Sequence, residues 1–183
     1  TINLTKEQLD DINRIFVVAC GTAYHAGMLA KHAIEKLTGI PVETAIASEF
    51  RYICPTVNEK SLTIIISQSG ETLDTLMALK EAKKKGSRIL SIVNVVGSTI
   101  SRESHDVLYT WAGPEIAVAS TKAYTSQLIA IYEIALYLAQ LKGTVSADEI
   151  DRLKCELIGL PELVERALDQ EEDIHKFARL HSK

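Results

Sequence analysis

The sequence contains few cysteines, and they show no pairing pattern. Cys20, Cys54 and Cys155 are an odd number, lie far apart and form no C-x-x-C pair. Disulfide-stabilised domains are dense in cysteine, and disulfides are rare in reducing compartments. We therefore exclude a disulfide scaffold and expect a cytoplasmic location.

Long hydrophobic runs are also missing. The best candidate, residues 123–141, contains Ser126, Gln127, Glu133 and Gln140, whereas a membrane-spanning helix needs about 20 predominantly apolar residues. We expect no membrane-spanning segment and no membrane partner. The chain begins at Thr1 rather than at a methionine, which favours a fragment of a longer chain.

Charge of one sign is not in large excess. There are 20 Lys and Arg against 24 Asp and Glu, and the formal net charge is −4 at pH 7. Residues 1–143 hold 14 acids and 14 bases, so the whole excess lies in residues 144–183, with ten acids and six bases. A nucleic-acid-binding domain carries a basic patch. We therefore expect no nucleic-acid partner. We also expect any ligand to bind through local hydrogen-bond donors rather than through a long-range electrostatic field.

Several cofactor signatures are absent. No G-x-G-x-x-G follows the first apolar run, and no G-K-[ST] of a P-loop occurs, so a dinucleotide and a nucleoside triphosphate are not expected. The five histidines form no H-x-x-x-H pair, and His25 and His32 lie seven residues apart, too far for one metal ion without further ligands. We expect no cofactor and no metal.

Short apolar, β-branched runs alternate with helix-like segments along the chain. The runs span residues 15–19, 41–47, 62–66, 88–95 and 107–111, and helical spacing marks residues 23–37, 73–85 and 121–141. Strands that are continuously apolar and alternate with helices form parallel sheets covered on both faces. The sequence therefore predicts a three-layer αβα domain with a five-stranded parallel, flavodoxin-like sheet.

The helix expected over residues 121–141 is apolar almost all round. Its polar residues Ser126, Glu133 and Gln140 recur every seven positions as one narrow stripe. We therefore expect this helix to be buried on most sides, within the domain or in a partner interface.

Two acidic helices are expected to follow, from about Ser146 and about Pro161. We assign the whole chain, residues 1–183, to a single domain on which the acidic helices of about 144–183 pack.

Three loops are rich in Gly, Ser and Thr: residues 20–22, 67–72 and 118–122. Sheets of this class bind ligands at the carboxyl ends of their strands, near the point where the strand order reverses. We place the candidate site there. Cys20 is a possible nucleophile, but no His–Asp pair can be placed beside it, and an inert small hydrophobe is the favoured interpretation.

The loop of residues 67–72 joins the most apolar strand to a helix. Ser69 is a natural N-cap, and Gly70 lets the backbone approach a ligand closely. Free N–H groups at the helix start, with the hydroxyls of Ser67, Ser69 and Thr72, can receive a phosphate. Considered alone, the loop is explained equally well by a phosphate site and by Ser69 acting only as a helix cap. In the third loop, Ser120 can cap its helix and also reach a pocket.

These loops resemble a known family. Together they look like the first sugar isomerase (SIS) domain of the glutamine–fructose-6-phosphate transaminases, the glucosamine-6-phosphate synthase family. The resemblance extends along nearly the whole chain. It rests on Cys20–Thr22, Ser48-Glu-Phe-Arg-Tyr52, Ser67-Gln-Ser-Gly-Glu-Thr72 and Ala112–Lys122.

The resemblance implies binding of a hexose 6-phosphate, fructose 6-phosphate or glucosamine 6-phosphate, in amino-sugar (hexosamine) biosynthesis. It implies that the phosphate is held by four residues, Ser67, Gln68, Ser69 and Thr72. It also implies that the sugar is lined by Thr22, Val118 and Ser120.

Enzymes of this family have a glutaminase domain followed by two SIS domains, with their acid/base residues in the second SIS domain and the C-terminal tail. The resemblance therefore implies no catalytic residue in this chain and an inactive fragment. It also implies three partners: the glutaminase domain, the second SIS domain and a second copy of the chain in a homodimer. Two alternatives stay open: a complete single-domain isomerase, for which Glu71 is the only nearby acid, and a sugar-phosphate-sensing module of a regulator.

Overall fold

The computed structural model describes residues 2–53, 56–117 and 119–182. The chain divides into two compact units, residues 1–145 and 146–183. Cys54 lies outside the described residues, while Cys20 and Cys155 are free thiols. No described helix is long and apolar enough to cross a membrane.

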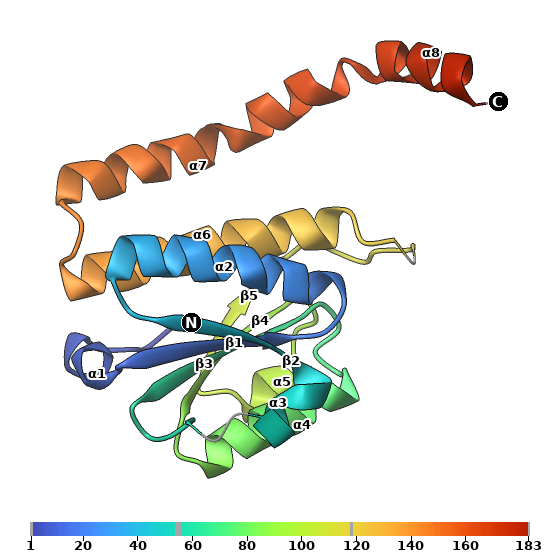
Figure 1. Cartoon of the computed structure of the whole chain (residues 1–183). Helices are drawn as coiled ribbons and strands as arrows, with labels where there is room; N and C mark the ends of the chain where they lie inside the picture. Colours follow the sequence, from blue (N-terminus) through green and yellow to red (C-terminus); the bar gives the residue numbers. More distant parts are fainter. Residues whose placement is uncertain (1, 54–55, 118, 183) are drawn as a thin grey trace. The chain divides into compact units, whose positions relative to one another are not determined.

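The first unit is built on one sheet of five strands (Figure 1). Every neighbouring pair is parallel, and the order is β2-β1-β3-β4-β5. This is the flavodoxin-like order, in which the strand order reverses between β1 and β3, and it confirms the predicted sheet. The strands are β1 (Arg14–Ala19), β2 (Val42–Ile46), β3 (Ser61–Ser67), β4 (Arg88–Val93) and β5 (Asp106–Tyr109).

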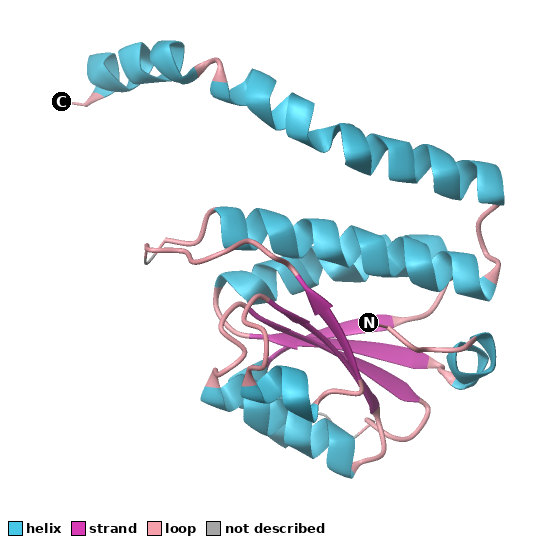
Figure 2. Ribbon diagram, turned by 180° about the vertical axis from the view of Figure 1, so that it is seen from behind, coloured by secondary structure: helices cyan, strands magenta, loops and turns pink. Residues whose placement is uncertain are grey.

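Helices cover both faces of the sheet, as the three-layer prediction requires (Figure 2). On one face lie α2 (Thr22–Thr38) and α6 (Lys122–Lys142). On the other lie α3 (Ala47–Ile53), α4 (Leu73–Lys84) and α5 (Thr99–Glu103). The short helix α1 (Lys6–Asp11) begins with a capping box between Thr5 and Gln8. The sequence pattern does not predict α1, α3 or α5.

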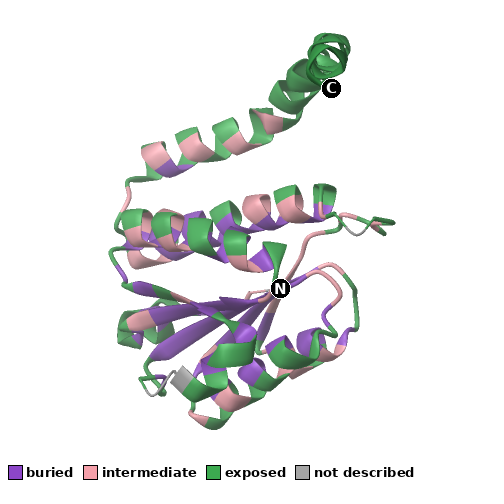
Figure 3. Cartoon of the chain, turned by 45° about the vertical axis from the view of Figure 1, so that its right-hand side comes forward, coloured by how far each residue is buried: buried purple, intermediate pink, exposed green. Residues whose placement is uncertain are grey.

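The three central strands β1, β3 and β4 are buried on both faces, which explains their continuous apolar sequence (Figure 3). In β1, Val17 belongs to the core shared with α2 and α6, and Phe16 belongs to the core on the opposite side. A Cβ on Gly27 of α2 would lie 3.0 Å from Val17 Cγ1, so this glycine allows α2 to pack closely on β1.

The prediction of a largely buried apolar helix is confirmed by α6. Ala130, Ile134 and Leu138 are buried in the core beside α2, while Glu133 and Gln140 of the predicted polar stripe are exposed. The helix is therefore buried mainly within its own domain.

The second unit consists of α7 (Ala147–Leu168) and α8 (Glu171–His181). The first acidic helix begins near Ser146, as expected, and Ser146 caps it by accepting a hydrogen bond from the Glu149 N–H. The prediction that a second helix starts at about Pro161 is wrong, because Pro161 lies inside α7. The fixed φ of proline is compatible with a helix, although Pro161 lacks an N–H donor and its ring crowds the carbonyl four residues earlier. Packing of these helices on the domain stays a prediction.

Candidate functional site

A pocket lies at the carboxyl ends of β1 and β3, where the strand order reverses. Ala19 pairs with Ile66, so the loops that follow these two strands lie side by side. The pocket has about 470 Å³ of empty space, part of it open to solvent. It is lined by Cys20, Thr22, Ala23, Ile66, Ser67, Gln68, Ser69, Thr72, Thr75, Ser120 and Gln127.

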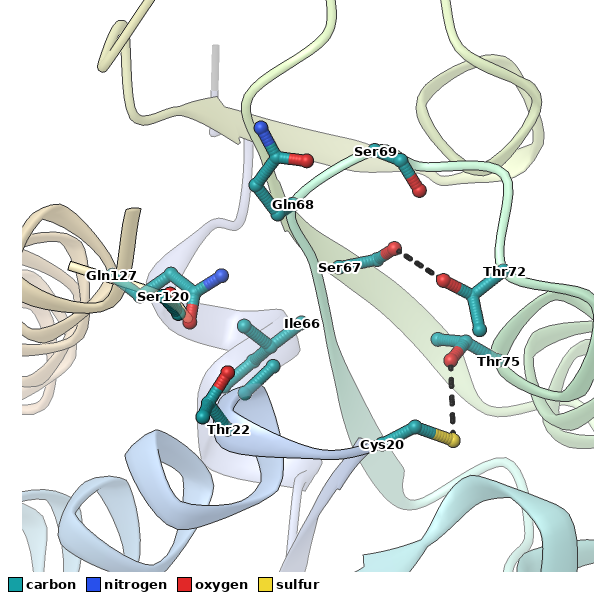
Figure 4. Close-up of a pocket in the computed structure, with 11 residues that line it drawn as sticks. Cys20, Thr22, Ile66, Ser67, Gln68, Ser69, Thr72, Thr75, Ser120 and Gln127 are labelled. Carbon is teal, nitrogen blue, oxygen red and sulfur yellow. Dashed lines mark hydrogen bonds between the residues drawn. The ribbon is translucent and has the colours of Figure 1, made fainter. Parts of the chain in front are cut away.

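The structure brings six of the seven predicted ligand-binding residues to this one pocket (Figure 4). Val118, the seventh, lies outside the described residues. The six that line the pocket are Thr22, Ser67, Gln68, Ser69, Thr72 and Ser120. Their contact with a sugar phosphate stays a prediction.

The loop after β3 folds back on itself before α4 begins. Ser67 Oγ accepts the Gly70 N–H at 3.1 Å and lies 3.3 Å from Thr72 Oγ1, and Ser69 Oγ accepts the Glu71 N–H at 3.2 Å. The prediction that Ser69 is the N-cap is therefore wrong. Thr72 holds that position, and its side chain makes no capping bond. The first-turn N–H groups of α4 are left for another acceptor.

The neighbouring loop after β4 supports the loop after β3. Asn94 N–H donates to the Gln68 carbonyl at 3.1 Å, and Ile100 N–H donates to the Gly70 carbonyl at 3.0 Å. Gly70 has φ of +67°, and a Cβ there would lie 2.1 Å from Ser98 Oγ. Only glycine satisfies both the backbone conformation and this close approach.

Glu71 does not line the pocket. Its Oε1 accepts the Thr99 N–H at 2.7 Å, at the start of α5. This backbone hydrogen bond is the main cause that lowers the pKa of Glu71, so the carboxylate is held ionised rather than tuned toward neutral pH.

Glu115 satisfies the N-terminus of α6. One of its oxygens accepts from the Thr121 N–H at 2.9 Å and the Ala123 N–H at 3.2 Å, and the Thr121 bond is the main cause of the lowered pKa of Glu115. The prediction that Ser120 caps α6 is therefore wrong. Thr121 is the N-cap residue, and the Ser120 hydroxyl donates to Glu115 at 3.4 Å while it lines the pocket.

Sequence reasoning missed Glu115, Thr75 and Gln127. Thr75 is buried one turn into α4, and its hydroxyl lies 3.9 Å from Cys20 Sγ. The burial of Gln127 could have been predicted from its spacing. It lies on the same helix face as Ala123 and Ala130 rather than on the predicted polar stripe of this helix. Glu115 gives little signal in the sequence, because a loop carboxylate six residues before the N-cap residue is not at a standard capping position.

The pocket lining is electrically neutral. Among the described residues that form it, none is acidic, basic or a histidine. Cys20 accordingly has no acid/base partner among them, and the described residues contain no group of three or more metal-ligating side chains. The arrangement can bind an anion through hydroxyls and N–H groups.

A parallel flavodoxin-like sheet with a serine-rich pocket after β3 is the architecture of sugar isomerase domains. The SIS domain family matches residues 8–137, and the chain belongs to this family. It is 58% identical over 183 residues, its full length, to the glutamine–fructose-6-phosphate aminotransferase [isomerizing] of Clostridium tetani. It is 62% identical over 180 residues, 98% of the chain, to that of Caldanaerobacter subterraneus subsp. tengcongensis. The chain spans 30% of the length of each of these relatives.

Solved structures show the same similarity. The C-terminal domain of glucosamine-fructose-6-phosphate aminotransferase from Francisella tularensis superposes with a TM-score of 0.91 at 42% identity, over 95% of this chain and 49% of that one. A phosphosugar isomerase structure from Bacillus subtilis, described as putative, gives a TM-score of 0.75 at 25% identity, over 98% of this chain and 56% of that one.

Proposed function

We propose that this chain is the sugar-phosphate-binding first SIS domain of a glutamine–fructose-6-phosphate aminotransferase. Its ligand is fructose 6-phosphate or glucosamine 6-phosphate, in amino-sugar biosynthesis. The observation that carries the proposal is the loop of residues 67–72, which places hydroxyls and a helix N-terminus around one pocket at the strand-order reversal. The identity of the relatives supports it.

The phosphate is held by neutral donors in this proposal. The hydroxyls of Ser67, Ser69 and Thr72 line the pocket, and the uncapped start of α4 supplies N–H groups and the positive end of the helix dipole. The remaining sugar atoms extend toward Thr22 and Ser120, which come from the other two loops.

The chemistry of the full enzyme requires groups from outside this chain. Moving a proton between adjacent sugar carbons needs an acid/base group within hydrogen-bond reach, and the described lining supplies hydroxyls, amides and one thiol. The partners in the proposal are therefore a glutaminase domain, which releases ammonia, and a second SIS domain. This arrangement is favoured over a complete single-domain isomerase.

Calorimetric titration of fructose 6-phosphate tests the proposal. Hydrogen bonds to a charged group contribute roughly 1.5–3 kcal/mol, so Ser69→Ala should weaken binding about 10- to 100-fold. Thr72→Val, which keeps the shape and removes the hydroxyl, should weaken it less. EDTA should leave the affinity unchanged.

The control for these variants is Ser104→Ala, since Ser104 ends α5 and donates to the Ile100 carbonyl without lining the pocket. Its affinity should equal that of the unmodified chain. Unchanged affinity in both Ser69→Ala and Thr72→Val would remove the loop from the site and end the proposal.

We also propose that the chain acts in the cytoplasm and as a homodimer. The body carries exposed large apolar side chains on its helices, among them Met28 and Leu29 of α2 and Tyr132 of α6. Apolar surface of this kind marks interfaces when it is contiguous. Sedimentation at micromolar concentration should show a species of twice the 20.1 kDa chain mass, and a purely monomeric species would contradict the dimer.

A further inference from the structure

Gln127 is a buried polar residue in a helix face that is otherwise apolar. Its exposed fraction is 4%, and its neighbours one turn away, Ala123, Ala130 and Ile131, are all buried. It lines the pocket from α6, on the side of Ser120, opposite the loop that carries Ser67 (Figure 4).

No hydrogen bond joins the Gln127 side chain to another described residue, and its amide faces the pocket rather than being one of the fully buried unpaired atoms. Most other buried polar side chains of this domain are paired, as Thr63 Oγ1 is with Ser87 Oγ at 2.8 Å; the described exceptions are Ser91 Oγ and Ser98 Oγ. Burying an amide without a partner is unfavourable, and native proteins rarely leave one unpaired. The pocket is the space in which Gln127 can find its partner.

We infer that Gln127 contacts the bound ligand and forms a hydrogen bond with a hydroxyl or carbonyl oxygen of the sugar. The inference rests on the proposed function and assigns a contact to the sugar rather than to the phosphate. A carboxamide donates and accepts, and so does a hydroxyl, so the two are complementary. A phosphate mainly accepts, and its donors are already gathered on the opposite side of the pocket.

The role predicted for Gln127 is discrimination between a sugar phosphate and a bare phosphate. A site built to form a hydrogen bond with a ligand hydroxyl rejects analogues that lack it, because its own buried polar group is then left unpaired. Gln127 therefore adds affinity for the polyol part of the ligand, while the 67–72 loop contributes equally to any phosphate that fits.

The test uses the 183-residue chain and two probes, fructose 6-phosphate and inorganic phosphate, with affinities measured by calorimetry and by competition. Gln127→Leu should weaken fructose 6-phosphate binding about tenfold. It should leave inorganic phosphate binding unchanged. The unfolding temperature should stay equal or rise, because the amide that is removed forms no hydrogen bond within the domain.

The matched control is Gln140→Leu, the same chemical change at an exposed position of α6, about 20 Å along the helix at a rise of about 1.5 Å per residue. It should bind both probes as the unmodified chain does. Gln127→Met, with an unbranched side chain of similar length, repeats the test if leucine prevents folding.

The outcomes separate this inference from the proposed function. If the unmodified chain binds fructose 6-phosphate and Gln127→Leu binds it equally well, the contact is overturned and the proposed function stands. An equal loss for both probes shows general damage to the pocket and also overturns the contact. If the unmodified chain binds neither probe, the proposed function fails, and the inference fails with it.

Discussion

Arg88 on β4 and Asp106 on β5 form a two-point ion pair across neighbouring strands, with N···O distances of 2.7 Å and 3.2 Å. The Asp106 side chain is 1% exposed, whereas that of Arg88 is 23% exposed. Asp106 Oδ1 also accepts the Asn3 N–H at 2.7 Å. One buried carboxylate therefore joins the last strand of the sheet to the N-terminal segment.

The first prediction concerns the loss of this pair. Arg88→Met should lower the free energy of unfolding by about 3–5 kcal/mol, because it leaves a buried carboxylate without its cation. Asp106→Leu should cost less, since the Arg88 side chain can turn to solvent. Urea denaturation measures both. As a control, Lys6→Ala removes an exposed pair with Asp10 and should change stability by less than about 1 kcal/mol; an equally small effect of Arg88→Met would contradict the prediction.

The second prediction concerns Gly70. Gly70→Ala should destabilise the domain by about 2–4 kcal/mol, through left-handed backbone strain together with the clash at Ser98, and should weaken fructose 6-phosphate binding. Gly143→Ala has a similar φ of +74° with no atom within 4 Å of the added Cβ, so it isolates the backbone strain. Chemical denaturation should show a lower free energy of unfolding for Gly70→Ala than for Gly143→Ala. The reverse order would show that the close approach of Gly70 to Ser98 is unimportant.

The third prediction is a pH dependence that arises from His105. Its Nδ1 accepts the Ile89 N–H at 2.9 Å, which requires an unprotonated Nδ1. Burial, followed by the charges of Lys83 and Arg88, lowers the pKa of His105 below its ordinary value. A lowered pKa means that folding favours the neutral form of His105. The contribution of His105 to the free energy of unfolding is therefore fully present above a pH of about 6.5.

That contribution should be lost as the pH falls from about 6.5 through the lowered pKa of His105. Denaturation midpoints measured between pH 7.5 and pH 5 should therefore decline more steeply for the unmodified chain than for His105→Asn, which keeps an acceptor without titrating. Parallel declines in the two proteins would assign the pH dependence to other groups.

The fourth prediction concerns catalysis. We expect the chain to bind hexose 6-phosphates without exchanging the protons on sugar carbons 1 and 2 with solvent deuterium, even with ammonia present. Glu71 has a lowered pKa and is bonded to Thr99, so it is a weak base that does not line the pocket. Exchange above background that Glu71→Gln abolishes would show that this chain is catalytic without its partner domains.

The sheet and most of the site were predictable because they depend on local pattern and on one topological rule. The apolar run of β3 and the loop after it are contiguous in sequence, and the strand order then brings Thr22 to the same pocket. Helix caps were harder to predict. Glu115 caps α6 across a six-residue gap, and Glu71 caps α5 rather than its own helix, so both depend on how loops fold in space.

The short helices and the course of α7 were missed for a related reason. The segment of α3 is seven residues long and that of α5 is five, too short to show a helical period. Proline at position 161 indicates a helix start because proline is common at the first helical position, but the same fixed φ is compatible with the interior of α7. In such segments tertiary packing decides the structure, and sequence spacing carries little information.

The neutral lining of the pocket has a consequence for how binding responds to salt. Where lysines or arginines hold an anion, dissolved ions screen the attraction and affinity falls as ionic strength rises. The described residues around this pocket offer fixed dipoles instead, and the body of the chain carries no net charge. Fructose 6-phosphate should therefore bind with nearly the same affinity in dilute buffer and in a concentrated, ion-rich solution.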